Sequence, residues 1–307
     1  MKRRQPHRRL SVITDVLIVT MVLGVFLVIS DFAENTKVID KKKTAAEGYE
    51  ENELKKPKNN IFTTDATDRT AQNEYIAKEI LDKYNIDVYY GNTAAGAGSV
   101  VNGDELYDQE NIFDNLTTVK NCLSKYPDNF FKEFKTGKNN YSISIYLIEK
   151  FNNDNIALAT RNSNNDFKIY LSNREDLNRV FHHELFHIIE YYLQLEYNTA
   201  KLFENWNSYN PVGYEYPNST KNIDKEFVHD EKYTKDNVFF VTRYAKTSAK
   251  EDRAEVFADL MFRENKLYYY SKGYSVRKKA DLLASVLEDK FISVRDDVVE
   301  RWEMLLQ

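Results

Sequence analysis

Alternation of apolar and polar residues predicts three neighbouring strands near the middle of the chain. They cover residues 141–151, 155–160 and 166–172, and residues 162–165 between the last two are rich in asparagine. Asparagine is common in turns because its side chain hydrogen-bonds the nearby backbone, and alternation with β-branched and aromatic residues is typical of strands. We therefore expect an antiparallel sheet from these segments.

Segments in which apolar residues recur at helical spacing lie before and after these strands in the sequence. Helices are expected at residues 70–84, 110–134, 174–197 and 250–264, and from Ser275 into the C-terminal segment, with one further strand at residues 86–91. Most helices follow the strands and do not alternate with them, which favours an α+β fold over a regular parallel α/β sheet.

A different pattern fills residues 10–30, which are apolar apart from a few polar positions and the single charge of Asp15. About twenty apolar residues are enough to cross a bilayer as a helix. Residues 1–9 are strongly basic, so the positive-inside rule places them in the cytoplasm and the rest of the chain outside. We expect a single-pass anchor in the cell membrane, with secretion after cleavage of a signal peptide as the alternative.

Residues 31–64 link this apolar run to the globular part. Nearly half of residues 31–60 are charged, and too few large apolar side chains are present to offset the entropy lost on ordering. The predicted organisation is a cytoplasmic basic tail at 1–9, the anchor at 10–30, a charged flexible stalk at 31–64 and one globular domain at 65–307.

Charge and cysteine content exclude two classes of function. The net charge is −5, but residues 1–9 contribute +5, so the other 298 residues carry −10. Because nucleic-acid binding requires neutralisation of phosphates, we expect no nucleic-acid partner. Cys122 is the only cysteine, which rules out an intramolecular disulfide and a cysteine-based zinc site.

The candidate chemistry lies in the long helix predicted at 174–197, where His183, Glu184 and His187 form an H-E-x-x-H motif. Histidines four residues apart project from one helix face and can bind one zinc ion. A glutamate beside them can take the proton of a water molecule that the metal acidifies. The alternative, two core histidines on an aromatic-rich face, leaves Glu184 among apolar neighbours without a role.

A catalytic zinc site has a third protein ligand, and three glutamates are candidates. Glu190 continues the same helix and is expected to point past the metal. Glu251 and Glu255 lie four residues apart on another predicted helix. One of these two carboxylates can reach the zinc, while the other can hold a ligand histidine through its second N–H.

These motifs together resemble those of the gluzincin metallopeptidases, in which H-E-x-x-H is followed by E-x-x-A-E, here Glu251 to Glu255. Tyr244, seven residues before Glu251, is spaced as in the catalytic domain of anthrax lethal factor and the related Pro-Pro endopeptidases. The resemblance covers residues 181–262. It implies a zincin-like domain with a mixed or antiparallel sheet and an active-site helix. It also implies Glu251 as the ligand, Glu255 behind a ligand, and Tyr244 as the donor to the oxyanion.

Some features remain open at this stage. The strand at 166–172 is either an edge to which an extended peptide adds or an interior strand. His229 is an alternative to Tyr244 as oxyanion donor or a surface histidine, and residues 268–270 are expected to serve packing. Residues 203–217 resemble a stretch of uncharacterised bacterial zinc peptidases, which implies no activity.

The sequence predicts a zinc-dependent endopeptidase that hydrolyses peptide or protein substrates outside the cell. One alternative is a non-catalytic surface binding module with a zincin fold, although the intact Glu184 argues against it. The other is a zinc amidase that cuts peptide crosslinks of the cell wall. Substrate sequence and oligomeric state cannot be read from the chain.

Overall fold

The computed structural model describes residues 66–153, 155–162, 166–197, 199–220, 223–224, 226–228, 238–294 and 298–307. The expected tail at 1–9, the anchor at 10–30, the whole expected stalk at 31–64 and His229 lie outside these ranges. Within the ranges, no helix is long and apolar enough to cross a membrane.

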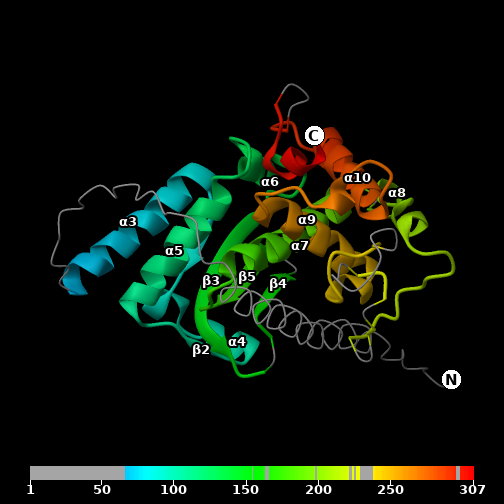
Figure 1. Cartoon of the computed structure of the whole chain (residues 1–307). Coiled ribbons are helices and arrows are strands. Elements are labelled where there is room, and N and C mark those ends of the chain that lie inside the picture. The colour runs from blue at the N-terminus through cyan, green and yellow to red at the C-terminus, as the bar shows by residue number, and fades with distance from the viewer. Residues whose placement is uncertain are drawn as a thin grey trace, which may run out of the picture.

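The described chain has a mixed α/β architecture in which helices cover both faces of one sheet (Figure 1). The helices are α3 (Ala66–Tyr84), α4 (Ala97–Val101), α5 (Gln109–Leu123), α6 (Glu133–Thr136), α7 (Leu177–Glu196), α8 (Thr199–Leu202), α9 (Ala249–Phe262) and α10 (Ser275–Lys290). The strands are β1 (Asp87–Tyr89), β2 (Gly103–Glu105), β3 (Ser142–Phe151), β4 (Ala157–Arg161) and β5 (Asp166–Ser172).

The sheet is mixed, with the strand order β1-β3-β5-β4. β3 runs parallel to β1 and β5, whereas β4 is antiparallel to β5 and β2 is antiparallel to β3. The sheet is therefore the mixed one of the two expected forms. The antiparallel arrangement expected for the three central strands is wrong for β3 and β5, because β4 lies at the outside and β5 inserts between β3 and β4. Alternation reports which face a residue occupies and carries no information about strand neighbours. β5 is an interior strand, and β4 forms an edge of the described sheet.

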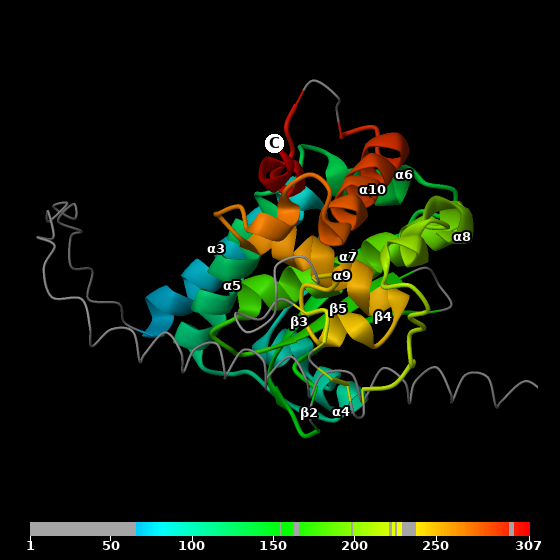
Figure 2. The same ribbon diagram turned by 45° about the vertical axis from the view of Figure 1, so that its right-hand side comes forward.

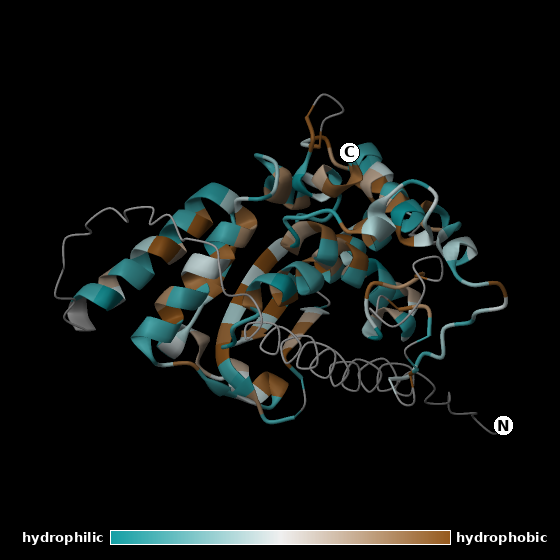
Figure 3. Ribbon diagram, viewed as in Figure 1, coloured by the Kyte–Doolittle hydropathy of each residue, from teal (hydrophilic) through white to brown (hydrophobic). Residues whose placement is uncertain are grey.

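The core lies between the sheet and α7, which packs against β4 and β5, and it continues between α7 and α9, which lie against each other (Figure 2). Phe181, Phe186 and Ile188 of α7 are fully buried, and burial of each such side chain contributes about 1.5–3 kcal/mol. Apolar residues accordingly concentrate on the strands and on the inner helix faces (Figure 3). A second, smaller cluster lies on the opposite face of the sheet, where α4 packs against β2 and β3.

Two predicted helices differ from the observed ones in an instructive way. The helix expected at 110–134 ends at Leu123 and resumes only as the short α6, because Pro127 cannot continue a helix and disfavours helical backbone before it. α9 begins one residue earlier than expected, where Ser248 accepts a hydrogen bond from the backbone N–H of Glu251 at 3.2 Å. This cap fixes the first turn of α9, from which Glu251 projects.

Candidate metal centre

Three side chains from α7 and α9 meet at one point. Nε2 of His183 lies 3.1 Å from Nε2 of His187 and 3.1 Å from Oε2 of Glu251, and the distance between His187 Nε2 and Glu251 Oε2 is 3.2 Å. Both histidines are buried, and Glu251 is nearly so. The structure thus brings together the three residues that were predicted as ligands, and together they could hold a metal ion.

The size of this triangle fits a small tetrahedral cation. With metal–ligand bonds of about 2.0–2.1 Å, neighbouring ligand atoms of a tetrahedral zinc site lie about 3.3 Å apart. The observed edges of 3.1–3.2 Å differ from that value by only a few tenths of an ångström. Two imidazole nitrogens and a carboxylate oxygen also form a donor set that zinc commonly takes.

Burial and neighbouring charges act in opposite directions on the pKa values of the three side chains of the triangle. Burial disfavours the charged form of both histidines. For His187 burial prevails and lowers the pKa to about 3. For His183 the hydrogen bonds with Glu251 and Glu255 outweigh burial and raise the pKa to about 10. Burial would raise the pKa of Glu251, but the two histidines hold it well below its usual value. The cluster therefore favours a cation between its members, and a proton or a metal ion can meet that demand.

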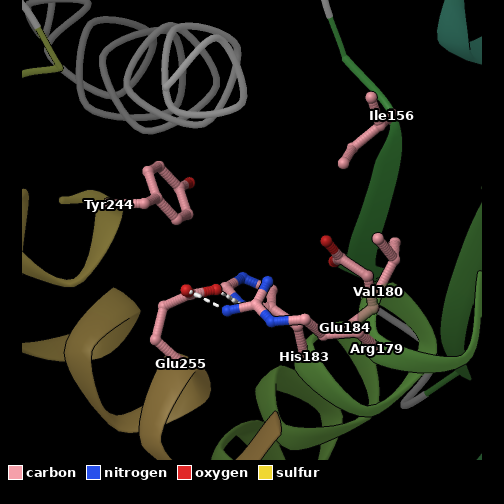
Figure 4. Close-up of a pocket in the computed structure, with 7 residues that line it drawn as sticks. All are labelled: Ile156, Arg179, Val180, His183, Glu184, Tyr244 and Glu255. Carbon is pink, nitrogen blue, oxygen red and sulfur yellow. Dashed lines mark hydrogen bonds and ion pairs between the residues drawn. The ribbon is translucent and has the colours of Figure 1, made fainter. Parts of the chain in front are cut away.

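Glu255 lies behind His183 and does not belong to the triangle. Its Oε1 lies 2.7 Å from Nδ1 of His183, and its Oε2 accepts hydrogen bonds from Arg179 and, at 2.6 Å, from the Thr242 hydroxyl (Figure 4). Burial would raise the pKa of Glu255, but the Arg179 guanidinium outweighs it and lowers the pKa to about 2. An ionised carboxylate in this position fixes the orientation of the histidine ring and makes its other nitrogen a better ligand.

Glu184 lies in a small pocket that Ile156, Val180, His183 and Tyr244 also line (Figure 4). Burial raises the pKa of Glu184 to about 7, against the opposing charge of His183 and a hydrogen bond from the backbone of Ala159 in β4. The carboxylate therefore lies between the active-site helix and the edge strand, where it can exchange a proton with a bound molecule.

Tyr244 faces Glu184 across this pocket (Figure 4). Its ring centroid lies 5.7 Å from that of His183. Burial, together with the negative charges of Glu251 and Glu184, raises the pKa of Tyr244 well above its usual value. The phenol therefore stays protonated and keeps a hydrogen to donate into the pocket.

Glu190 takes no part in the centre, as its position one turn further along the helix suggested. It is buried, and its Oε1 accepts a hydrogen bond of 2.8 Å from Nε of Arg253 on α9. This ion pair links α7 to α9 and balances the charge of Glu190.

Apart from Glu255, the residues that support the centre were not predicted from the sequence. Arg179 lies four residues before His183 on the same helix face, so its spacing was a usable signal. Thr242 and the contacts of Asp252 carried no such signal, because they depend on how distant segments pack. Residues 203–217 now have a structural role, since Trp206 and Tyr216 both donate hydrogen bonds to Asp252.

Comparison with models of known protein families and with curated proteins gives no match. A solved structure of a "putative zinc-binding metallo-peptidase" from Bacteroides caccae is similar over 76% of this chain and 90% of its own, at 17% sequence identity and a TM-score of 0.43. Similarity of this degree does not establish a shared family, so the function has to be inferred from the site itself.

Proposed function

We propose that this protein is a zinc-dependent endopeptidase of the gluzincin type. The observation that carries the proposal is the triangle formed by His183, His187 and Glu251, with the uncoordinated carboxylate of Glu184 beside it in a pocket. The register, with Glu251 in the triangle and Glu255 behind His183, is the one that the resemblance to the lethal factor and Pro-Pro endopeptidase family implied.

Zinc bound by these three side chains would supply a Lewis acid that acidifies a water molecule and polarises a carbonyl group. Glu184 would accept the proton of the attacking water and transfer it to the leaving amine, as a general base and then a general acid. The hydroxyl of Tyr244 would donate a hydrogen bond to the oxygen on which negative charge develops. Glu255 would keep His183 oriented throughout.

The edge strand supports a peptide as substrate. β4 pairs with β5 on one side only among the described strands, and its residues lie beside Glu184. An extended peptide can add to such an edge through main-chain hydrogen bonds. We propose a peptide or protein substrate for this reason, and endopeptidase action because the strand continues beyond the pocket.

The location of the reaction is a separate proposal, which depends on residues 1–30. Their basic cluster and apolar run support a single-pass anchor with the centre outside the cell, or secretion after cleavage. Protease added to intact cells should then remove the part of the chain that carries the centre. Protection of the whole chain in intact cells would contradict the proposal.

The test of function uses the full chain, loaded with zinc, and a pool of internally quenched peptides. We expect hydrolysis that chelator abolishes, and a fall of about 100-fold or more in Glu184→Gln with retention of zinc. Glu175→Gln makes the same chemical change at an exposed position just before α7 and should leave the rate unchanged.

Equal rates for wild type and Glu184→Gln would contradict the mechanism. Absence of any peptide cleavage, with release of fragments from purified peptidoglycan, would favour the amidase. Absence of both reactions in the zinc-loaded protein would favour a binding module.

A further inference from the structure

Two cationic side chains, one from β4 and one from α9, flank one tyrosine ring of α7. Nζ of Lys250 lies 3.0 Å from the hydroxyl of Tyr191 and 4.4 Å from the ring centroid. The guanidinium carbon of Arg161 lies 5.7 Å from the same centroid. In the part of the chain that the structure describes, neither cation forms an ion pair with a carboxylate, whereas the neighbouring Arg253 is neutralised by Glu190.

The position of this pair follows from two periodicities. Ala159 of β4 contributes a backbone hydrogen bond to Glu184 and faces the main core. Arg161 lies two residues further, so it projects from the same face of the sheet, about 7 Å along the strand. On α7, Tyr191 follows Glu184 by seven residues, about two turns on the same helix face. Strand and helix thus lead from the pocket to the pair along one line.

A peptide that adds to the edge of β4 with its scissile bond at Glu184 would pass this pair. A side chain about two residues from the scissile bond would lie near Arg161. Lys250 precedes Glu251 on α9 and places a second positive charge at the same place. Lys250 is held by its hydrogen bond to the hydroxyl of Tyr191, so little conformational entropy is lost when it meets an anion.

We infer that Arg161 and Lys250 form a subsite for an acidic side chain of the substrate, about two residues from the bond that is cut. The inference rests on the proposed peptidase function. An acidic ligand is notable here, because residues 10–307 carry a net charge of −10 and would repel acidic peptides elsewhere. The subsite provides a local exception to that repulsion.

The experiment compares peptides that differ only by Glu or Gln at each position around the cleavage site, with the full zinc-loaded chain. We expect kcat/KM to be roughly fivefold higher for Glu at one position, as for a favourable solvent-exposed ion pair, and the ratio to shrink as salt increases. Arg161→Glu should abolish or invert the ratio without loss of zinc. Lys250→Met should reduce it.

Lys168→Glu is the matched control. Lys168 lies on the neighbouring strand β5 and contacts the ring of Tyr146 at 5.5 Å in the same way. It alternates with Phe167 and Ile169, which face the main core, so it projects from the opposite face of the sheet. This charge reversal should leave the ratio for Glu over Gln unchanged.

A second measurement separates this inference from the proposed function. Binding of the same paired peptides is measured with the Glu184→Gln variant and with the double variant that also carries Arg161→Glu. If the Glu peptides bind more tightly than the Gln peptides to the single variant, and this difference is lost in the double variant, the result supports the subsite even if no peptide is cut. Cleavage without a preference for Glu at any position overturns the subsite and leaves the peptidase. Equal binding of Glu and Gln peptides, with no cleavage, overturns both.

Discussion

Glu251 and Asp252 are consecutive carboxylates in the first turn of α9, yet they lie in opposite environments. Oε2 of Glu251 lies within hydrogen-bond distance of two imidazoles, His183 at 3.1 Å and His187 at 3.2 Å. Asp252 is fully buried, and its Oδ2 accepts hydrogen bonds from Trp206 at 2.9 Å, Tyr216 at 2.7 Å and Lys279 at 2.6 Å.

The comparison shows how to distinguish a structural carboxylate from a ligand. A buried carboxylate is costly unless it is paired and hydrogen-bonded. Asp252 pairs with the cation of Lys279 inside the protein, so its charge is balanced without a metal ion. The partners of Glu251 are two imidazoles, which carry positive charge only with a bound proton or metal ion, so its charge is balanced only by a proton or a metal ion.

The largest expected effect is on metal binding. Glu251→Ala should abolish or greatly weaken zinc binding, because two histidines alone leave the site with too few ligands. Glu255→Ala should weaken it by about 10- to 100-fold, the range for a residue that orients a ligand. Competition with a zinc chelator and metal analysis measure both. Zinc retained by Glu251→Ala and lost by Glu255→Ala would reverse the assignment.

A smaller effect is expected on stability at Asp252. Lys279→Met leaves a buried carboxylate without its cation, so the free energy of unfolding should fall by about 3–5 kcal/mol. Tyr216→Phe removes one hydrogen bond to the same carboxylate and should cost about 1.5–3 kcal/mol. Urea denaturation of the full chain measures both.

Lys120→Met provides the control, since Lys120 pairs with Glu79 at 2.7 Å on the surface. It should leave the midpoint of unfolding almost unchanged. A loss for Lys279→Met no larger than this would mean that Asp252 does not depend on its buried cation.

The smallest change concerns Cys122, a buried ionisable group without a cation bound to it. Burial raises its pKa to about 12, and its Sγ lies 3.3 Å from Oδ1 of Asn178. Because only the thiolate reacts, the native protein should react with a thiol reagent at pH 8 at least about 100-fold more slowly than the protein in urea. Raising the pH from 7 to 8 should increase the reaction rate of the unfolded protein about tenfold. The thiol of the native protein should stay almost entirely protonated over the same range. Equal rates would show that Cys122 is accessible.

Much of the candidate centre follows from local spacing. His183, Glu184 and His187 share a helix, and the period of that helix alone puts both imidazoles on one face. The cap formed by Ser248 and Glu251 is also a local pattern, although the start expected for α9 was one residue too late without it. The existence of β3, β4 and β5 could also be predicted, because alternation is a property of each strand by itself.

Tertiary structure alone decided the rest, because it depends on contacts between residues far apart in the chain. Neither the parallel pairing of β3 with β5 nor the edge position of β4 is encoded in alternation. Glu190, Glu251 and Glu255 were all possible third ligands. Of these three, packing brings only Glu251 to the Nε2 atoms of both histidines, while Arg253 pairs with Glu190 and Arg179 with Glu255. Spacing determines which face a side chain occupies, whereas its partner is determined by the free energy of burying charges together, which only the packed structure specifies.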